Sequence, residues 1–210
     1  ILVIAAHPDD EILGVGATIA KHAANKDQVS VVIAAQGATS RYSDTDSNSE
    51  RVKSEVSCLR ECAKAAAKVL GTNEPVFLDF PDNQMDTVTL LSVVHALEKI
   101  IESVQPQIIY THHGGDLNVD HQIVHRAALT ACRPLPNSTI EAIYTYETLS
   151  STEWYSTQQQ MPFIANRYVE VSEFLHKKIQ ALQCYEKEMR PFPHPRSVEA
   201  IEALAKLRGA

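Results

Sequence analysis

The chain has 210 residues, of which 44% are hydrophobic and 21% are charged, and its formal net charge is −7 at pH 7. This length suits one well-buried domain and is short for two, so we expect a single domain over residues 1–210. The negative charge and the lack of a Lys/Arg stripe argue against a nucleic-acid partner. No run of about 18 apolar residues occurs, so the sequence predicts no membrane span.

Apolar runs alternate with longer amphipathic stretches along the whole chain. Strands are predicted over residues 1–6, 28–35, 75–80, 107–111, 140–146 and 168–171. Helices are predicted from Glu11 onward and over 50–70, 89–104, about 120–132, 172–189 and 198–207, with Gly71 capping the second. The polar stretches 40–49 and 150–160 are typical of loops. This alternation predicts a Rossmann-like α/β fold with a mostly parallel sheet, helices on both faces and a site at the carboxyl ends of the strands.

Two polar clusters follow predicted strands and precede predicted helices. The first comprises His7, Asp9, Asp10 and Glu11, and the second comprises His112, His113, Asp116, Asn118, Asp120 and His121. Because the carboxyl ends of parallel strands share one edge of a sheet, the two clusters can converge. Imidazole and carboxylate ligands suit zinc, and a hydrolytic zinc site uses three protein ligands and one water whose pKa falls to about 7. The clusters therefore predict a His/Asp/His metal site with a spare carboxylate as general base.

Simpler interpretations of these residues remain open. Asp9 and Asp10 could only cap the helix that follows them, and either cluster alone is weak evidence for a metal. A dinucleotide site would require G-x-G-x-x-G at the first turn, whereas Gly14 and Gly16 lie one turn into the helix. Carboxylates at that turn would also repel a pyrophosphate. Two clusters at matching positions favour the metal site.

The four cysteines are Cys58, Cys62, Cys132 and Cys184. They form no CxxC pair, and their apolar neighbours favour small core residues in a reduced compartment. We therefore expect a cytoplasmic protein.

The motifs AHPDDE (residues 6–11) and HxxDxNxDH (residues 113–121) resemble those of the zinc-dependent PIG-L/LmbE-like deacetylase family. That family includes the N-acetylglucosaminyl-phosphatidylinositol deacetylase and the deacetylases of the mycothiol and bacillithiol pathways. The resemblance extends over nearly the whole chain in motif order. It implies a metal-dependent amide hydrolase that removes acetyl from an N-acetylated amino sugar, a small-molecule substrate. Members commonly form hexamers, so it also implies a homo-oligomer.

The resemblance carries site roles to matching positions. His7, Asp10 and His121 are implied zinc ligands, and Asp9 is the implied general base. The remaining implied roles are an orienting carboxylate at Asp120 and substrate contacts at Arg51 and Asp82. Glu11 is expected only to open the helix or to support the other residues of its cluster.

One position departs from the family pattern. Many members have a histidine three residues before the third ligand, where this chain has Asn118. Asparagine can donate a hydrogen bond but cannot carry a proton, so the acid role must lie elsewhere. Asp9 could return its proton to the leaving amine, or His194 could assist, although His194 is equally consistent with an exposed turn residue. His112 could also replace His121 as a ligand.

Three alternatives to an amino-sugar deacetylase on zinc are left open. The same site could act on a thiol conjugate or an antibiotic. The protein could bind a sugar and a metal without turnover. A His/Asp/His site also accepts other divalent ions.

Overall fold

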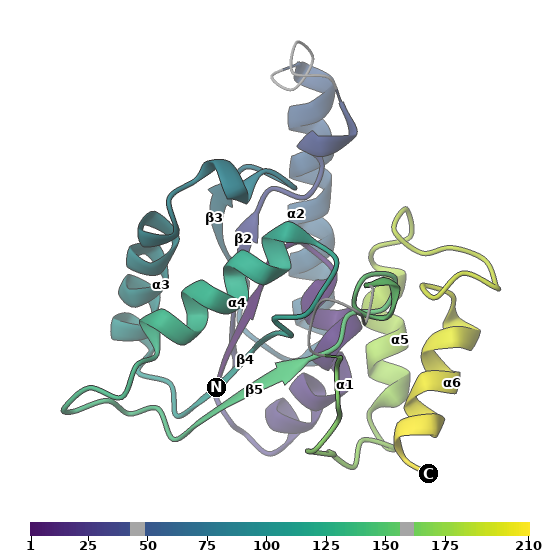
Figure 1. Ribbon diagram of the computed structural model, residues 1–210. Helices are drawn as coiled ribbons and strands as arrows, with labels where there is room; N and C mark the ends of the chain where they lie inside the picture. Colours follow the sequence, from purple (N-terminus) through teal and green to yellow (C-terminus); the bar gives the residue numbers. More distant parts are fainter. Residues whose placement is uncertain (43–48, 156–161) are drawn as a thin grey trace.

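A computed structural model gives the structure of residues 1–42, 49–155 and 162–210, and within these ranges five strands form one parallel sheet with helices on both sides (Figure 1). In chain order the strands and helices are β1 (Leu2–Ala5), α1 (Asp10–Ala24), β2 (Ser30–Ala35), α2 (Glu50–Leu70), β3 (Val76–Phe80), α3 (Leu90–Val104), β4 (Ile108–His112), α4 (Val119–Ala131), β5 (Ala142–Tyr146), α5 (Leu175–Gln183) and α6 (Val198–Arg208). Short 3-10 turns cover Thr39–Arg41, Met85–Thr87 and Thr152–Trp154. The predicted α/β fold is confirmed.

The order of the strands across the sheet is β3-β2-β1-β4-β5. The chain winds outward from β1 to β3 and then returns to lay β4 on the opposite side of β1, which pairs in parallel with both β2 and β4. The winding direction therefore reverses between β1 and β4. Open parallel sheets bind their ligands in the crevice at this reversal, at the carboxyl ends of the strands. The first polar cluster follows β1, and the second begins at the end of β4.

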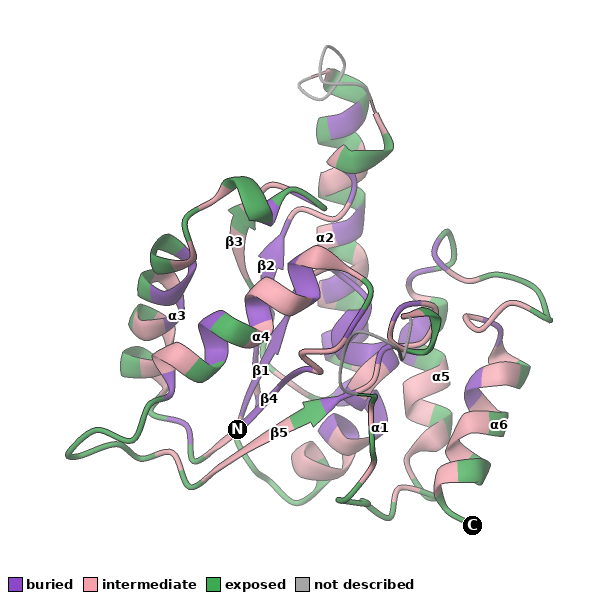
Figure 2. Cartoon of the chain, in the orientation of Figure 1, coloured by how far each residue is buried: buried purple, intermediate pink, exposed green. Residues whose placement is uncertain are grey.

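β1 is an uninterrupted apolar run because both of its faces are buried. Val3 packs into a core that α1, α2 and α5 cover, whereas Leu2 and Ile4 pack into a second core beneath α3 and α4. In Figure 2 the central strands are coloured as buried, and the helices around them carry buried and exposed residues on different sides. The sheet is thus held rigidly between two layers, and the turn after β1 is anchored on a fully buried strand.

Most predicted elements agree with the structure to within a few residues. The helix α2 begins and ends where the sequence predicts, since Ser49 caps its first turn and Gly71 takes the left-handed conformation (φ 81°) at its end. The helix predicted over 172–189 is shorter, at Leu175–Gln183. The strand predicted over 168–171 is wrong: this segment lies outside the sheet, and Tyr168 is 62% exposed, so its alternating side chains bury no face.

Both predicted polar loops lie partly outside the described residues, at 43–48 and 156–160. Among the described helices, none combines the length and the apolar character that a membrane span requires.

Candidate metal centre and active site

The turn between β1 and α1 is held by its own acidic side chains. A carboxylate oxygen of Asp10 accepts a hydrogen bond from the backbone N–H of His7 (2.8 Å), and Glu11 accepts one from the backbone N–H of Asp9 (3.0 Å). These bonds satisfy N–H groups at the start of a helix, where the helix dipole also favours negative charge. Asp9 adopts a left-handed conformation with φ 108°. The turn therefore fixes where the side chains of His7, Asp9 and Asp10 can point.

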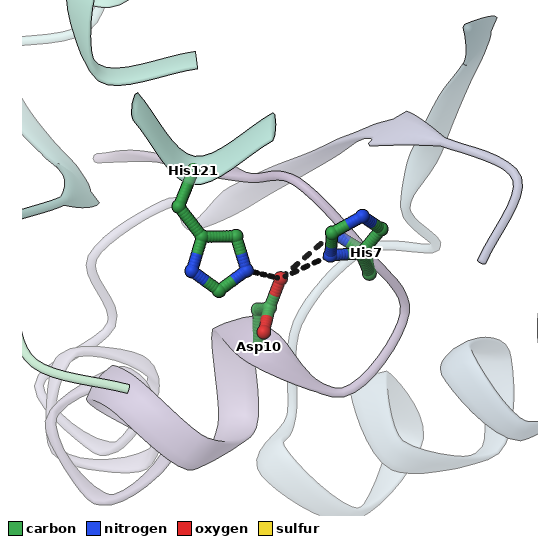
Figure 3. A group of neighbouring side chains, drawn as sticks. All are labelled: His7, Asp10 and His121. Atoms are coloured by element: carbon green, nitrogen blue, oxygen red, sulfur yellow. Dashed lines mark hydrogen bonds and ion pairs between the residues drawn. The ribbon is translucent and has the colours of Figure 1, made fainter. Parts of the chain in front are cut away.

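The side chains of His7, Asp10 and His121 converge at the end of β1 (Figure 3). Asp10 Oδ2 lies 3.2 Å from His7 Nδ1 and 3.1 Å from His121 Nε2. One donor atom from each residue lies within 4.8 Å of the others. Ligand atoms around tetrahedral zinc, with bonds of about 2.0–2.1 Å, are roughly 3.3 Å apart. The donor set and its spacing fit a zinc ion, and nitrogen–oxygen donors of this kind also accept other divalent ions.

Asp120 supports the first imidazole. Its Oδ2 lies 2.9 Å from His7 Nε2, the nitrogen on the far side of the ring from Asp10. Asp120 is completely buried and also accepts hydrogen bonds from the backbone N–H groups of Asn83 (2.6 Å) and Met85 (3.0 Å). With its position fixed in this way, Asp120 can hold the His7 ring in one orientation, as carboxylates do behind zinc-binding histidines.

Asp116 supports the imidazole of His121 as Asp120 supports that of His7. Its Oδ1 lies 3.0 Å from His121 Nδ1, while His121 Nε2 faces Asp10. The hydroxyls of Ser151 and Thr152 both donate to Asp116. The sequence puts Asp116 in the second cluster but indicates no role for it, because the residues that bind its carboxylate come from a distant loop.

Strong electrostatic coupling accompanies this geometry. Burial lowers the pKa of His121, but Asp10 and Asp116 outweigh that effect and raise the pKa to about 9. Burial likewise lowers the pKa of His7, yet Asp10 and Asp120 hold it well above its usual range. Burial raises the pKa of Asp10, whereas His121 and its neighbouring imidazoles hold it well below normal. The buried carboxylates thus attract positive charge, which protons or a divalent cation can supply.

Asp9 lies beside the three converging side chains and lines a polar cavity of about 140 Å³. The cavity is lined by His7, Pro8, Asp9, Gly37, Ser40, Arg41, Asp82, Asn83, Asn118, His121, Ser150, Ser151, Glu188 and Arg196. Burial raises the pKa of Asp9 to about 7, although the guanidinium of Arg196 opposes this rise. A carboxyl group that titrates near neutral pH beside a metal site can accept and release a proton during turnover.

The two residues predicted to contact substrate differ in position. Asp82 lines the cavity, is buried, and accepts hydrogen bonds from the backbone N–H (3.0 Å) and the hydroxyl (2.6 Å) of Ser40. Arg51 lies in the first turn of α2 with its side chain 78% exposed, and it does not belong to the described cavity lining. Arg41 lines the cavity instead. Arg41 belongs to a polar stretch without periodicity, so no local pattern pointed to it.

Asn118 lines the cavity and is the N-cap of α4. Its Oδ1 accepts from the backbone N–H of Asp120 (2.8 Å), and its Nδ2 donates to Asn83 Oδ1 (2.7 Å). The residue thus has a structural role in addition to any contact with substrate.

His194 lies in the turn before α6, and the described cavity lining does not include it. Its Nδ1 accepts from the backbone N–H of Arg196 (3.0 Å), and its ring packs edge-on against Trp154. Arg196, two residues further on, reaches the cavity. The turn that contains His194 therefore does reach the site, but through the side chain of Arg196.

Two other residues of the clusters lie behind the site. His112 is fully buried, and its Nε2 accepts from the backbone N–H of Ala6 (2.9 Å), which leaves His121 as the histidine that faces Asp10 most closely. Glu11 accepts from the hydroxyl of Tyr185 (2.8 Å), and burial raises its pKa to about 8 despite this bond.

The family follows from comparison with known proteins. A family model described as "PIG-L: GlcNAc-PI de-N-acetylase" matches residues 2–132. The chain belongs to the PIG-L family. It is 35% identical over 166 residues to the uncharacterized deacetylase YaiS of Escherichia coli strain K12, covering 77% of this chain and 79% of YaiS. A relative named as a deacetylase, together with the family match, supports amide hydrolysis as the reaction class.

Solved structures show that the fold is shared. The N,N'-diacetylchitobiose deacetylase of Pyrococcus horikoshii matches with a TM-score of 0.76 at 20% identity, covering 99% of this chain and 77% of that one. The 4-carboxy-2-hydroxymuconate hydratase GalB of Pseudomonas putida matches with a TM-score of 0.75 at 24% identity, covering 99% and 85%. Since a hydratase and a deacetylase share this fold, the reaction must be argued from the site.

Proposed function

We propose that this PIG-L protein is a zinc-dependent hydrolase that removes the acetyl group from an N-acetylated amino sugar or its conjugate. The proposal rests on the convergence of donor atoms of His7, Asp10 and His121 within 4.8 Å, next to a polar cavity that His7, Asp9 and His121 line. The matched family is described by a de-N-acetylase of a GlcNAc conjugate, and one structural neighbour deacetylates a chitobiose, which supports an amino-sugar substrate.

Zinc held by these three side chains would polarise the acetamide carbonyl and lower the pKa of a water molecule to about 7. Asp9 accepts the proton of the attacking water and returns it to the leaving nitrogen. We assign both proton transfers to Asp9 because its side chain lines the cavity. His194 is not among the described residues that line it. Asp120 and Asp116 keep the two imidazoles turned toward Asp10.

The cavity also offers groups for binding the sugar. One hydrogen of Asn118 Nδ2 is used by Asn83, and the second can donate to the acetamide oxygen. Asp82 can accept from a sugar hydroxyl at the cavity wall. Arg51, at the exposed start of α2, would contact only a part of the substrate that extends beyond the cavity.

The test is amine release from a panel of N-acetylated sugars, measured with added zinc and with a chelator. We expect zinc-dependent turnover by the wild type and a loss of roughly 10²–10⁴ in kcat for Asp9→Asn. Asp86→Asn is the matched control, because Asp86 is an exposed aspartate outside the described cavity lining, and it should retain full activity. Turnover by Asp9→Asn at the wild-type rate, or by the chelated enzyme, would contradict the mechanism.

The same panel separates the alternatives. Adding an N-acylated thiol conjugate and an N-acylated antibiotic to the panel tests whether the same site acts on a different substrate. Sugar binding without amine release from any member would contradict hydrolysis. Light scattering of the purified protein tests the proposed homo-oligomer, for which a hexamer is the expected state.

A further inference from the structure

We propose that Arg196 is the positioning residue for Asp9: it holds one carboxylate oxygen of Asp9 so that the other is presented to the attacking water. This inference rests on the proposed function, in which Asp9 moves the proton. It assigns a role to the turn between α5 and α6, which lies beyond the part of the chain that the family model matches, residues 2–132.

The contact between the two residues is direct and sheltered from solvent. Arg196 Nη1 donates to Asp9 Oδ2 at 2.8 Å, across 187 positions of sequence. The side chain of Asp9 is 5% exposed and that of Arg196 is 23% exposed. A charged hydrogen bond in such surroundings is stronger and more directional than one at the surface. It can therefore select one rotation of the carboxylate.

Both the backbone and the side chain of Asp9 are held by hydrogen bonds. Its backbone N–H is bound by Glu11, which supports the left-handed conformation of the turn. Its side chain is bound by Arg196. A carboxylate held at one oxygen can still accept a proton at the other, so the bond constrains direction without removing the acceptor.

Arg196 is itself fixed by neighbours from two segments, the loop after β5 and the connection between α5 and α6. Its Nε donates to Ser150 Oγ (2.7 Å), and its backbone N–H donates to His194 Nδ1 (3.0 Å). Its Nη1 also lies 3.7 Å from Glu188 Oε2, while the other oxygen of Glu188 accepts from Arg41 Nη2 at 2.7 Å. A planar guanidinium that makes several bonds at fixed angles is suited to this task, and a lysine ammonium is not.

The experiment compares kinetics of zinc-loaded wild type, Arg196→Ala, Arg196→Lys and Arg190→Ala. We expect Arg196→Ala to lose roughly 100-fold in kcat with KM changed less than about twofold, because a misdirected base slows the chemical step without altering binding. Arg196→Lys should recover only part of that loss. Guanidinium ions below denaturing concentration should partly restore Arg196→Ala. Arg190→Ala is the matched control, an exposed arginine in the same turn whose Nη1 donates to backbone carbonyls of Lys187 and Met189.

A double variant tests whether Arg196 acts through Asp9. Asp9→Asn/Arg196→Ala should be no slower than Asp9→Asn alone, since the arginine has nothing left to position. A further 100-fold loss in the double variant, or a rise in KM at unchanged kcat for Arg196→Ala, would overturn the inference in favour of direct contact with substrate. Loss of zinc affinity in Arg196→Ala would overturn it in favour of a structural role.

Failure of this inference differs from failure of the proposed function. If wild type turns over and Arg196→Ala is equally fast, only the role of Arg196 is refuted. If wild type releases no amine from any substrate, the proposed function fails, and the crystal structure of zinc-loaded Arg196→Ala still decides the positioning role. A rotated or disordered Asp9 carboxylate in that structure supports it, and a carboxylate unchanged from wild type refutes it.

Discussion

Adding a single methyl group at Gly14 should destabilise the fold, because no space is available there for a Cβ atom. Gly14 lies in α1 directly against the ring of Tyr146 in β5. A Cβ at Gly14 would lie 2.2, 2.6 and 2.8 Å from three ring carbons of Tyr146, well inside van der Waals contact. The ring cannot move aside freely, because it is buried and its hydroxyl donates to the backbone oxygen of Ile4 (3.2 Å). Gly14→Ala must therefore displace either the helix or the ring.

The expected size of the effect follows from opposing contributions. Alanine normally stabilises a helix interior by about 1 kcal/mol relative to glycine. Overpacking a core costs about 1–3 kcal/mol, and three contacts this short indicate the upper part of that range. Losing the Tyr146 hydrogen bond costs about 1 kcal/mol more. Since the gain in helix propensity and the loss of the hydrogen bond nearly cancel, we expect Gly14→Ala to lower the free energy of unfolding by about 2–3 kcal/mol.

Urea unfolding followed by circular dichroism measures this change, with an unchanged m-value as the check on two-state behaviour. Gly209→Ala is the control, since its Cβ would approach no atom closer than 3.4 Å and should alter stability by less than about 0.5 kcal/mol. Because the Tyr146 ring also contacts His112, which stacks on His121, zinc affinity should weaken in Gly14→Ala as well. A Gly14→Ala protein as stable as wild type would refute the reasoning.

Three further predictions concern the metal centre and the packing of α5. Asp116→Asn should weaken zinc binding by about 10–100-fold in a competition titration, because it removes the carboxylate 3.0 Å from His121 Nδ1; an unchanged Kd would exclude a supporting role. Removing the metal with a chelator should lower the unfolding temperature as well as activity, by the mass-action stabilisation that binding provides, and an unshifted transition would argue against binding at this site. Burial lowers the pKa of Lys178 to about 8, although Glu147 opposes this. Lys178 therefore binds its proton more tightly in the unfolded protein than in the folded one. Between pH 8 and 10.5 the wild type should therefore gain stability relative to Lys178→Met, and a constant difference would contradict the shifted pKa.

Local sequence predicted elements well where the local signals and the tertiary environment agree. The bounds of α2 follow from a polar cap, an amphipathic run and a terminal glycine, all within one segment. The segment 168–171 has the alternation of a strand but remains outside the sheet, because strand formation depends on a partner edge that the segment itself does not supply. The family pattern favours Arg51 as a substrate contact, whereas the backbone brings Arg41 to the cavity.

The kinds of side chain at the metal centre, and the strand ends on which they lie, follow from local sequence. A buried strand followed by His-Pro-Asp-Asp-Glu, and a second followed by a His/Asp-rich turn, specify imidazoles and carboxylates at one edge of a parallel sheet. Which residues orient these imidazoles and carboxylates depends on contacts between distant segments. Asp116 reaches His121 with the help of Ser151, and Arg196 meets Asp9 across 187 positions. Such contacts join segments that are far apart in the sequence and become neighbours only when the helix layers pack. A local sequence pattern therefore cannot predict them.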